Sequence, residues 1–81
     1  MPANKNLAQV FNLVANEVEG EIRSYSGRFM YGAKCMSIVC SDPMRCVEVA
    51  IENGLKGARM DNMGLDYVVY WPDTLSIEMS V

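Results

Sequence analysis

The N-terminal part of the chain carries a helical pattern of hydrophobic residues. Apolar side chains recur at steps of three and four from Leu7 to Ile22, which places them on one stripe of an α-helix. Either Asn4 or Asn6 can cap this helix, because asparagine side chains accept hydrogen bonds from the first free backbone amides. The pattern predicts a helix over about residues 6–24. This helix would be about 28 Å long, so we expect part of it to pack on another subunit.

The middle of the chain predicts a buried strand and then a helix. Residues 35–40 read CMSIVC, a short apolar run with a β-branched centre, which is typical of a buried strand. Asp42 and Pro43 mark a helix start, because the carboxylate caps free amides and proline fits the first helical position. Asn53 and Gly54 mark a left-handed helix exit. The apolar side chains of this second helix are Met44, Val47, Ala50 and Ile51, with Leu55 closing its end.

The C-terminal third predicts three strands. Residues 57–60 form a short strand, residues 61–64 a turn, and residues 67–71 a strand rich in aromatic and β-branched side chains. Pro72 ends this strand, and residues 75–79 then alternate between apolar and polar, as in a strand with one wet face. The predicted order is helix, strand, helix, strand, strand, strand. It corresponds to an α+β fold with two helices packed on one face of a small mixed β-sheet, built around a right-handed strand–helix–strand crossover.

The length and charge of the chain limit its organisation and its partners. Its 81 residues are 51% apolar and carry a formal charge of −3, so we expect a single domain over residues 1–81 with one thin core. Such a core rarely supplies more than about 3–5 kcal/mol, which favours a homo-oligomer, formed through the N-terminal helix. The seven Lys and Arg residues are spread along the chain, whereas binding to a nucleic-acid backbone needs clustered cations. We therefore expect no nucleic-acid partner.

Residues that could carry out chemistry are few. The chain has no histidine, which removes the commonest general base and the commonest metal ligand. Cys35, Cys40 and Cys46 match no metal-binding spacing and are odd in number, so we expect reduced, buried thiols. No apolar stretch reaches the roughly 18 residues of a membrane span, and the N-terminus lacks the pattern of a signal peptide. The sequence predicts a cytoplasmic protein that is not an enzyme and holds no metal or cofactor.

The stretch SYSGRFMYG, residues 24–32, does not follow a core pattern. Ser26 and Gly27 can expose backbone amides at a sharp turn, and Arg28 offers planar, bidentate donors suited to phosphate or carboxylate. Tyr31 can stack on a base or another ring. The alternative is purely structural, because Gly27 could close a helix while Arg28 lies near its negative end.

The stretch DNMGLDYVVYWP, residues 61–72, has the same ambiguity. Gly64 is suited to a positive-φ turn, so the stretch could be a hairpin connection followed by a core strand. In the functional interpretation the turn forms one wall of a pocket, where Asn62 or Asp66 contacts a polar edge of a ligand. The predicted ligand site consists of Ser26, Gly27, Arg28, Tyr31, Asn62 and Asp66.

Methionine is abundant near both stretches. The chain has seven methionines, and this flexible, polarisable side chain fills gaps in small cores or forms adaptable binding surfaces. The methionines closest to the two stretches are Met30, Met36, Met44, Met60 and Met63. Both interpretations remain open for them.

The motifs SGRFMYG and GARMDNMGLDYVVYWP resemble those of small bacteriophage and mobile-element proteins, over residues 24–72. The resemblance implies a phage or prophage origin, where small proteins often disarm host defences. It carries no assigned site residues. We therefore expect a non-enzymatic counter-defence protein that sequesters a small anionic, nucleotide-type ligand. The alternative is a protein inhibitor that docks on a host defence protein, such as a CRISPR effector complex, through methionine and aromatic side chains.

Overall fold

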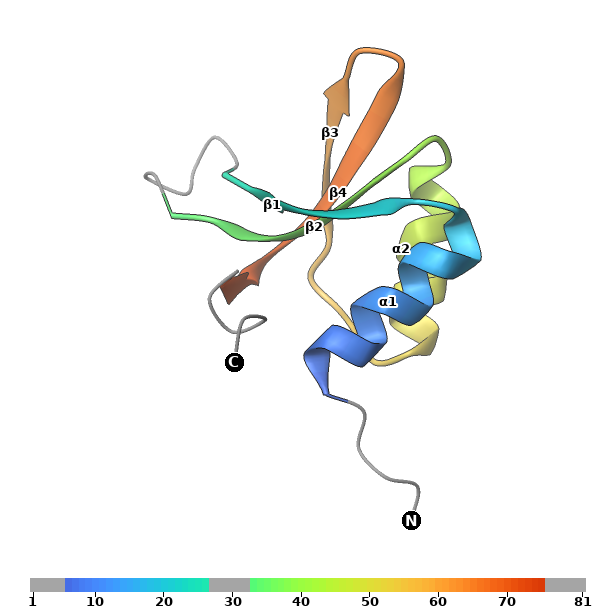
Figure 1. The fold of residues 1–81 in the computed structure, drawn as a ribbon, viewed down its shortest axis with the longest axis vertical. Coiled ribbons are helices and arrows are strands. Elements are labelled where there is room, and N and C mark those ends of the chain that lie inside the picture. The colour runs from blue at the N-terminus through green and yellow to red at the C-terminus, as the bar shows by residue number, and fades with distance from the viewer. Residues whose placement is uncertain (1–5, 27–32, 76–81) are drawn as a thin grey trace.

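The computed structural model describes residues 6–26 and 33–75 of the chain. Within them, the order is helix, strand, strand, helix, strand, strand (Figure 1), which differs from the predicted order because two strands, rather than one, lie between the helices. The elements are α1 (Leu7–Val18), β1 (Glu21–Tyr25), β2 (Cys35–Cys40), α2 (Pro43–Glu52), β3 (Arg59–Met63) and β4 (Asp66–Leu75). The predicted α+β class, with two helices against a four-stranded sheet, is confirmed.

The four strands form one antiparallel sheet in the order β1-β2-β4-β3. The prediction of a mixed sheet with a strand–helix–strand crossover is therefore wrong. Helix α2 instead connects two hairpins, β1–β2 and β3–β4, and the second hairpin pairs with the first through β4. This arrangement leaves β1 and β3 as the two edges of the sheet.

Helix α1 is shorter than its hydrophobic pattern predicts. Asn6 caps it, since its side chain accepts a hydrogen bond from the Gln9 amide while the Gln9 side chain accepts one from the Asn6 amide. The helix ends at Val18 because Glu19 adopts a left-handed conformation with φ 54°. Gly20 then allows β1 to run close to β2. The predicted helix over 6–24 thus fails at its C-terminal end, where Ile22 continues the apolar spacing from a strand.

The core lies between the two helices and one face of the sheet, and Figure 1 shows α1 and α2 together on that side. Phe11 of α1 and Trp71 of β4 are fully buried at its centre, with their rings edge to face and 5.0 Å between centroids. Alternate residues of β2 contribute Met36 and Ile38 to the same core. This alternation follows from the two-residue period of a strand.

Helix α2 has the ends that its sequence predicts. The Asp42 side chain accepts a hydrogen bond from the Arg45 amide at 3.2 Å, and Pro43 occupies the first turn. At the other end Gly54 has φ 85°. Leu55 is buried, and its amide bonds the Ala50 carbonyl at 2.8 Å.

The β3–β4 hairpin differs from its prediction in register and length. The turn is Gly64–Leu65, with Gly64 at the expected positive φ, whereas residues 61–63 belong to β3 rather than to the turn. Strand β4 does not end at Pro72 but continues to Leu75 across a register shift. The Thr74 hydroxyl bridges this irregularity, since it donates to the Trp71 carbonyl and accepts from the Met36 amide. Residues 76–79 of the predicted last strand lie outside the described residues.

Candidate functional site

Three of the six predicted site residues can be placed. Ser26 is exposed directly after β1, Asn62 is exposed on β3, and Asp66 is exposed at the start of β4. Gly27, Arg28 and Tyr31 lie outside the described residues. A pocket in which Arg28 and Tyr31 face Asn62 and Asp66 therefore stays a prediction.

The sheet register separates Ser26 from the other two residues. Tyr25, which precedes Ser26, pairs with Cys35 at one end of β2, whereas Tyr67, which follows Asp66, pairs with Cys40 at the other end. Five residue steps along a strand span about 17 Å. Asn62 also pairs with Tyr67, so the structure places Asn62 and Asp66 near each other but not near Ser26.

Two shallow depressions adjoin Asp66 and the start of α2. One has a volume of about 290 Å³ and the other about 450 Å³. The first is lined by Glu19, Gly20, Glu21, Val39, Cys40, Ser41 and Asp66, and the second by Asn16, Glu17, Val18, Glu19, Ser41, Asp42 and Arg45. Their charged side chains are mostly carboxylates, which disfavour an anionic ligand.

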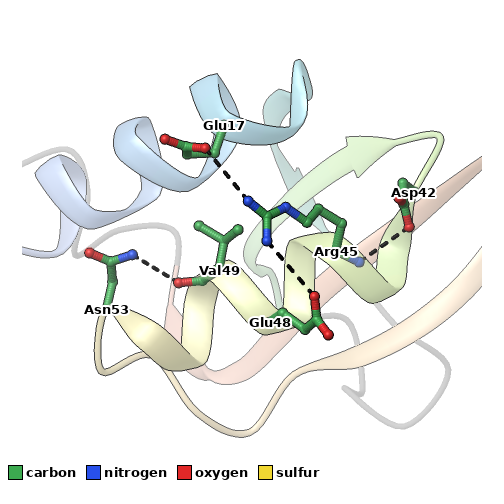
Figure 2. Close-up of polar contacts among 6 residues, drawn as sticks. All are labelled: Glu17, Asp42, Arg45, Glu48, Val49 and Asn53. Atoms are coloured by element: carbon green, nitrogen blue, oxygen red, sulfur yellow. Dashed lines mark hydrogen bonds and ion pairs between the residues drawn. The ribbon is translucent and has the colours of Figure 1, made fainter.

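Arg45 is the one cation in the lining of these depressions, and it is engaged by carboxylates. Figure 2 shows its guanidinium between Glu17 of α1 and Glu48 of α2, with nitrogen–oxygen distances of 3.9 Å to each. All three side chains are about half exposed or more, so each ion pair is worth at most about 1 kcal/mol. The arrangement orients α1 against α2 but offers little attraction to phosphate.

The cysteines form no reactive centre. Cys35 and Cys40 on β2 and Cys46 on α2 are free and buried, which confirms the predicted unpaired thiols in a strand and a helix. Burial raises the pKa of all three, and that of Cys46 reaches about 12. The nucleophilic thiolate is therefore scarce. Within residues 6–26 and 33–75, no group of three His, Cys, Asp or Glu side chains is arranged to hold a metal ion.

The sheet face opposite the helices carries a contact that sequence analysis missed. The Tyr25 hydroxyl on β1 donates a hydrogen bond to Asp61 Oδ2 on β3, so the two edge strands are tied across the sheet. Beneath this bond, the rings of Tyr25 and Tyr70 lie 4.9 Å apart. The hydrogen bond to Asp61 is the main cause that raises the pKa of Tyr25 to about 12. A phenol held protonated in this way is a structural tie rather than a general base.

The β3–β4 hairpin carries exposed apolar side chains. The sequence analysis identified its methionines but did not predict that they would be grouped on one hairpin. We call Met60, Met63, Leu65 and Tyr67 the hairpin surface, which wraps around the hairpin: Met60 and Tyr67 lie on the face that Val69 continues into the core, Met63 lies on the opposite face, and Leu65 lies at the turn. Leu65 at the turn is 99% exposed, and the other three side chains are 37–45% exposed. Methionine content hinted at an adaptable surface, but only strand pairing brings these four residues onto one hairpin.

Helix α2 has two exposed apolar residues, Met44 near its start and Ile51 near its end. Met44 lies at the start of α2, which follows the end of β2 that pairs with Tyr67, and it is 62% exposed. Ile51 is also exposed but lies seven residues further along the helix, about 10 Å away by helical rise. Met44 therefore lies at the end of α2 nearer the hairpin, whereas Ile51 lies further along the helix and is separate from the hairpin surface.

A scan against family models and searches of curated proteins and solved structures found no match for this chain. Within the part of the chain that the structure describes, no helix has the length and apolar character needed to cross a membrane. The function is therefore inferred from the surfaces of the molecule itself.

Proposed function

We propose that this protein is a non-enzymatic binding protein that docks on another protein through the hairpin surface. The observation that carries the proposal is the concentration of large, exposed apolar side chains on the β3–β4 hairpin. In Figure 1 this hairpin projects beyond the neighbouring strands at the top of the view. A projecting apolar tip can enter a partner's groove without rearrangement of the rest of the fold.

The chemistry of the hairpin surface suits a protein partner. Fully burying a side chain such as Leu65 or Met63 contributes about 1.5–3 kcal/mol, so a few of them can supply the centre of an interface. Methionine adapts its shape to a partner surface, and Tyr67 supplies an aromatic ring of the type enriched at interface centres. Exposed apolar residues scattered singly need no explanation, but four on one hairpin favour an interaction site.

The surroundings of the hairpin favour a protein over the small anionic ligand that was the first expectation. The depression beside Asp66 is lined mainly by carboxylates, and Arg45 in the adjoining depression already faces Glu17 and Glu48. An anionic ligand there would meet like charge. The phage resemblance implies a host defence protein as the partner, and inhibition by docking in the host cytoplasm would need no catalytic group.

A capture experiment from phage-infected host cells tests this proposal. The tagged chain is compared with Leu65→Lys and Met63→Lys, which place a charge on the hairpin surface without removing a buried side chain. We expect both variants to lose at least about tenfold in affinity for the captured protein, because each removes an apolar contact worth about 1.5 kcal/mol or more.

Ile51→Lys is the matched control. It makes the same kind of change at an exposed apolar residue of α2 that is separate from the hairpin surface, and a cation near a helix C-terminus is favourable. We expect this variant to retain capture. Equal capture by all variants, or equal loss in the Ile51→Lys control, would show that the hairpin surface is not the docking site.

A further inference from the structure

The outer edge of β3 is a regular strand edge that no described residue pairs with. Strand β3 is the last in the sheet order, and its outer side carries unpaired backbone groups. Four of its five side chains are exposed. Such an edge is a template for pairing with another strand unless a charge, proline or bulge blocks it.

The turn type determines which residues of β3 direct their backbone groups outward. Gly64 and Leu65 form a two-residue turn with positive φ only at Gly64, as in a type II′ turn. The pair that closes such a turn, Met63 and Asp66, is a hydrogen-bonded pair, and pairs alternate along the ladder. Met60 and Asn62 are then in non-hydrogen-bonded pairs with β4. Their N–H and C=O groups point to the outer edge.

Charge selects one register for an antiparallel pair of β3 strands. If two copies pair with Asp61 opposite Asp61, like charges meet directly, which is destabilising. If they pair with Met60 opposite Met60, Arg59 of each copy lies opposite Asp61 of the other. In that register the outward backbone groups of Met60 face each other, and those of Asn62 face Ala58 of the second copy. The outward backbone groups of Met60 and Asn62 would also face each other in the first register, so hydrogen bonding permits both alignments and charge decides between them.

The side chains around Met60 are available for this pairing. Arg59 is exposed and makes no ion pair with any other described residue. Asp61 accepts from Tyr25 through Oδ2, which leaves Oδ1 to accept from a guanidinium. Met60 is 45% exposed on the opposite side of the strand, where it would pack against its counterpart.

We infer that β3 pairs with β3 of a second copy, in antiparallel register about Met60, to form a homodimer with a continuous sheet. This interface differs from the predicted one at the N-terminal helix. The apolar stripe of α1 is used within the chain, since Phe11, Val14 and Ala15 are buried and its other apolar residues pack against the same core. The inference does not depend on the proposed function: it uses the edge of β3 and Met60 of the hairpin surface, and it leaves Leu65 at the turn free for a partner.

Charge exchange between two variants tests the register. Arg59→Asp alone places two carboxylates opposite each other across the interface, and Asp61→Arg alone places two guanidinium groups opposite each other, so each homodimer contains like-charged pairs. An equimolar mixture restores opposite charges in both pairs. By sedimentation velocity over a concentration series, we expect each single variant to dissociate at least about tenfold more readily than wild type, and the mixture to recover association.

Asn62→Pro provides a second test that does not disturb Asp61. Proline is tolerated where the strand N–H faces solvent, so the hairpin should persist while the outward donor of Asn62 is lost. We expect unchanged far-ultraviolet circular dichroism and loss of the dimer. This variant and Arg59→Asp decide the question even if Asp61→Arg fails to fold.

Three results would overturn the inferred interface. One is a wild-type protein that sediments only as the 9.0 kDa species across the whole series. The second is a wild-type dimer that survives Asn62→Pro and Arg59→Asp unchanged. The third is a mixture of properly folded charge variants that associates no better than either alone. Leu65→Lys should leave the dimer intact while abolishing partner capture, so failure of this interface and failure of the proposed function are distinguishable.

Discussion

Replacing Gly20 with alanine should destabilise the fold through a steric clash between β1 and β2. A Cβ atom at this position would lie 2.6 Å from Ile38 Cγ2 and 2.9 Å from the Val39 carbonyl oxygen. The first contact is with a buried core side chain, and the second is with the backbone of β2. Neither can move freely, because β2 is paired with β1 on one side and with β4 on the other.

The size of the Gly20→Ala effect follows from two opposing contributions. Forcing an extra methyl group into a packed region costs about 1–3 kcal/mol. Alanine also reduces the conformational freedom of the unfolded chain, which stabilises the protein by about 0.4–1 kcal/mol. We therefore expect a net loss of about 1–2 kcal/mol in the free energy of unfolding. In a domain of this size, such a loss lowers Tm by roughly 5–15 °C.

Urea unfolding followed by circular dichroism measures this loss. The midpoint concentration should fall while the slope of the transition stays the same, since the area exposed on unfolding is unchanged. Ile38→Leu removes Cγ2 with little change in volume, so Gly20→Ala should cost less in that background. A Gly20→Ala variant as stable as wild type, or one with the same cost in both backgrounds, would refute the steric explanation.

Three other predictions concern Tyr25, Cys46 and Arg28. In the folded protein the pKa of Tyr25 is about 12, above its ordinary value of about 10. The protonated Tyr25 hydroxyl therefore contributes fully to the free energy of unfolding below pH 10, and this contribution is lost as the pH rises through 12. In denaturant titrations at several pH values, Tyr25→Phe should show a smaller fall in stability over this range than wild type. Native Cys46 should resist iodoacetamide until denaturant exposes it, because burial raises its pKa to about 12; rapid alkylation of the native protein would contradict this. If residues 24–32 bind an anion, nucleotides should raise the Tm of wild type but not of Arg28→Ala or Arg28→Lys, and a wild type that shows no such rise would exclude the site.

The sequence predicted correctly those features that depend on interactions between residues close together in the chain. The ends of α2 were predicted correctly from Asp42, Pro43 and Gly54, because capping depends on backbone groups within a few residues. The buried strand at residues 35–40 was also predicted, because a short apolar run with a β-branched centre is a local signal. The positive φ of Gly64 was also predicted, but not the number of residues in its turn.

Ambiguous periodicity explains the error at the end of α1. Ile22 lies four residues after Val18, which continues a helical stripe, yet it also faces the core from β1. The two patterns cannot be told apart over so few residues. Pairing of Ile22 with Ile38 on β2 decided the outcome, and this long-range contact leaves no signal in the local sequence.

The sequence by itself determined the α+β class, the ends of α2, the buried thiols and the lack of histidine chemistry, because these depend on composition or on neighbouring residues. Only the tertiary structure decided the antiparallel strand order, the Tyr25–Asp61 bond and the hairpin surface. Tyr25 and Asp61 are 36 positions apart in the chain, and the free edge of β3 exists only because β4 takes the inner position. Strand pairing over such separations depends on the packing of the whole core, which no short stretch of the sequence encodes.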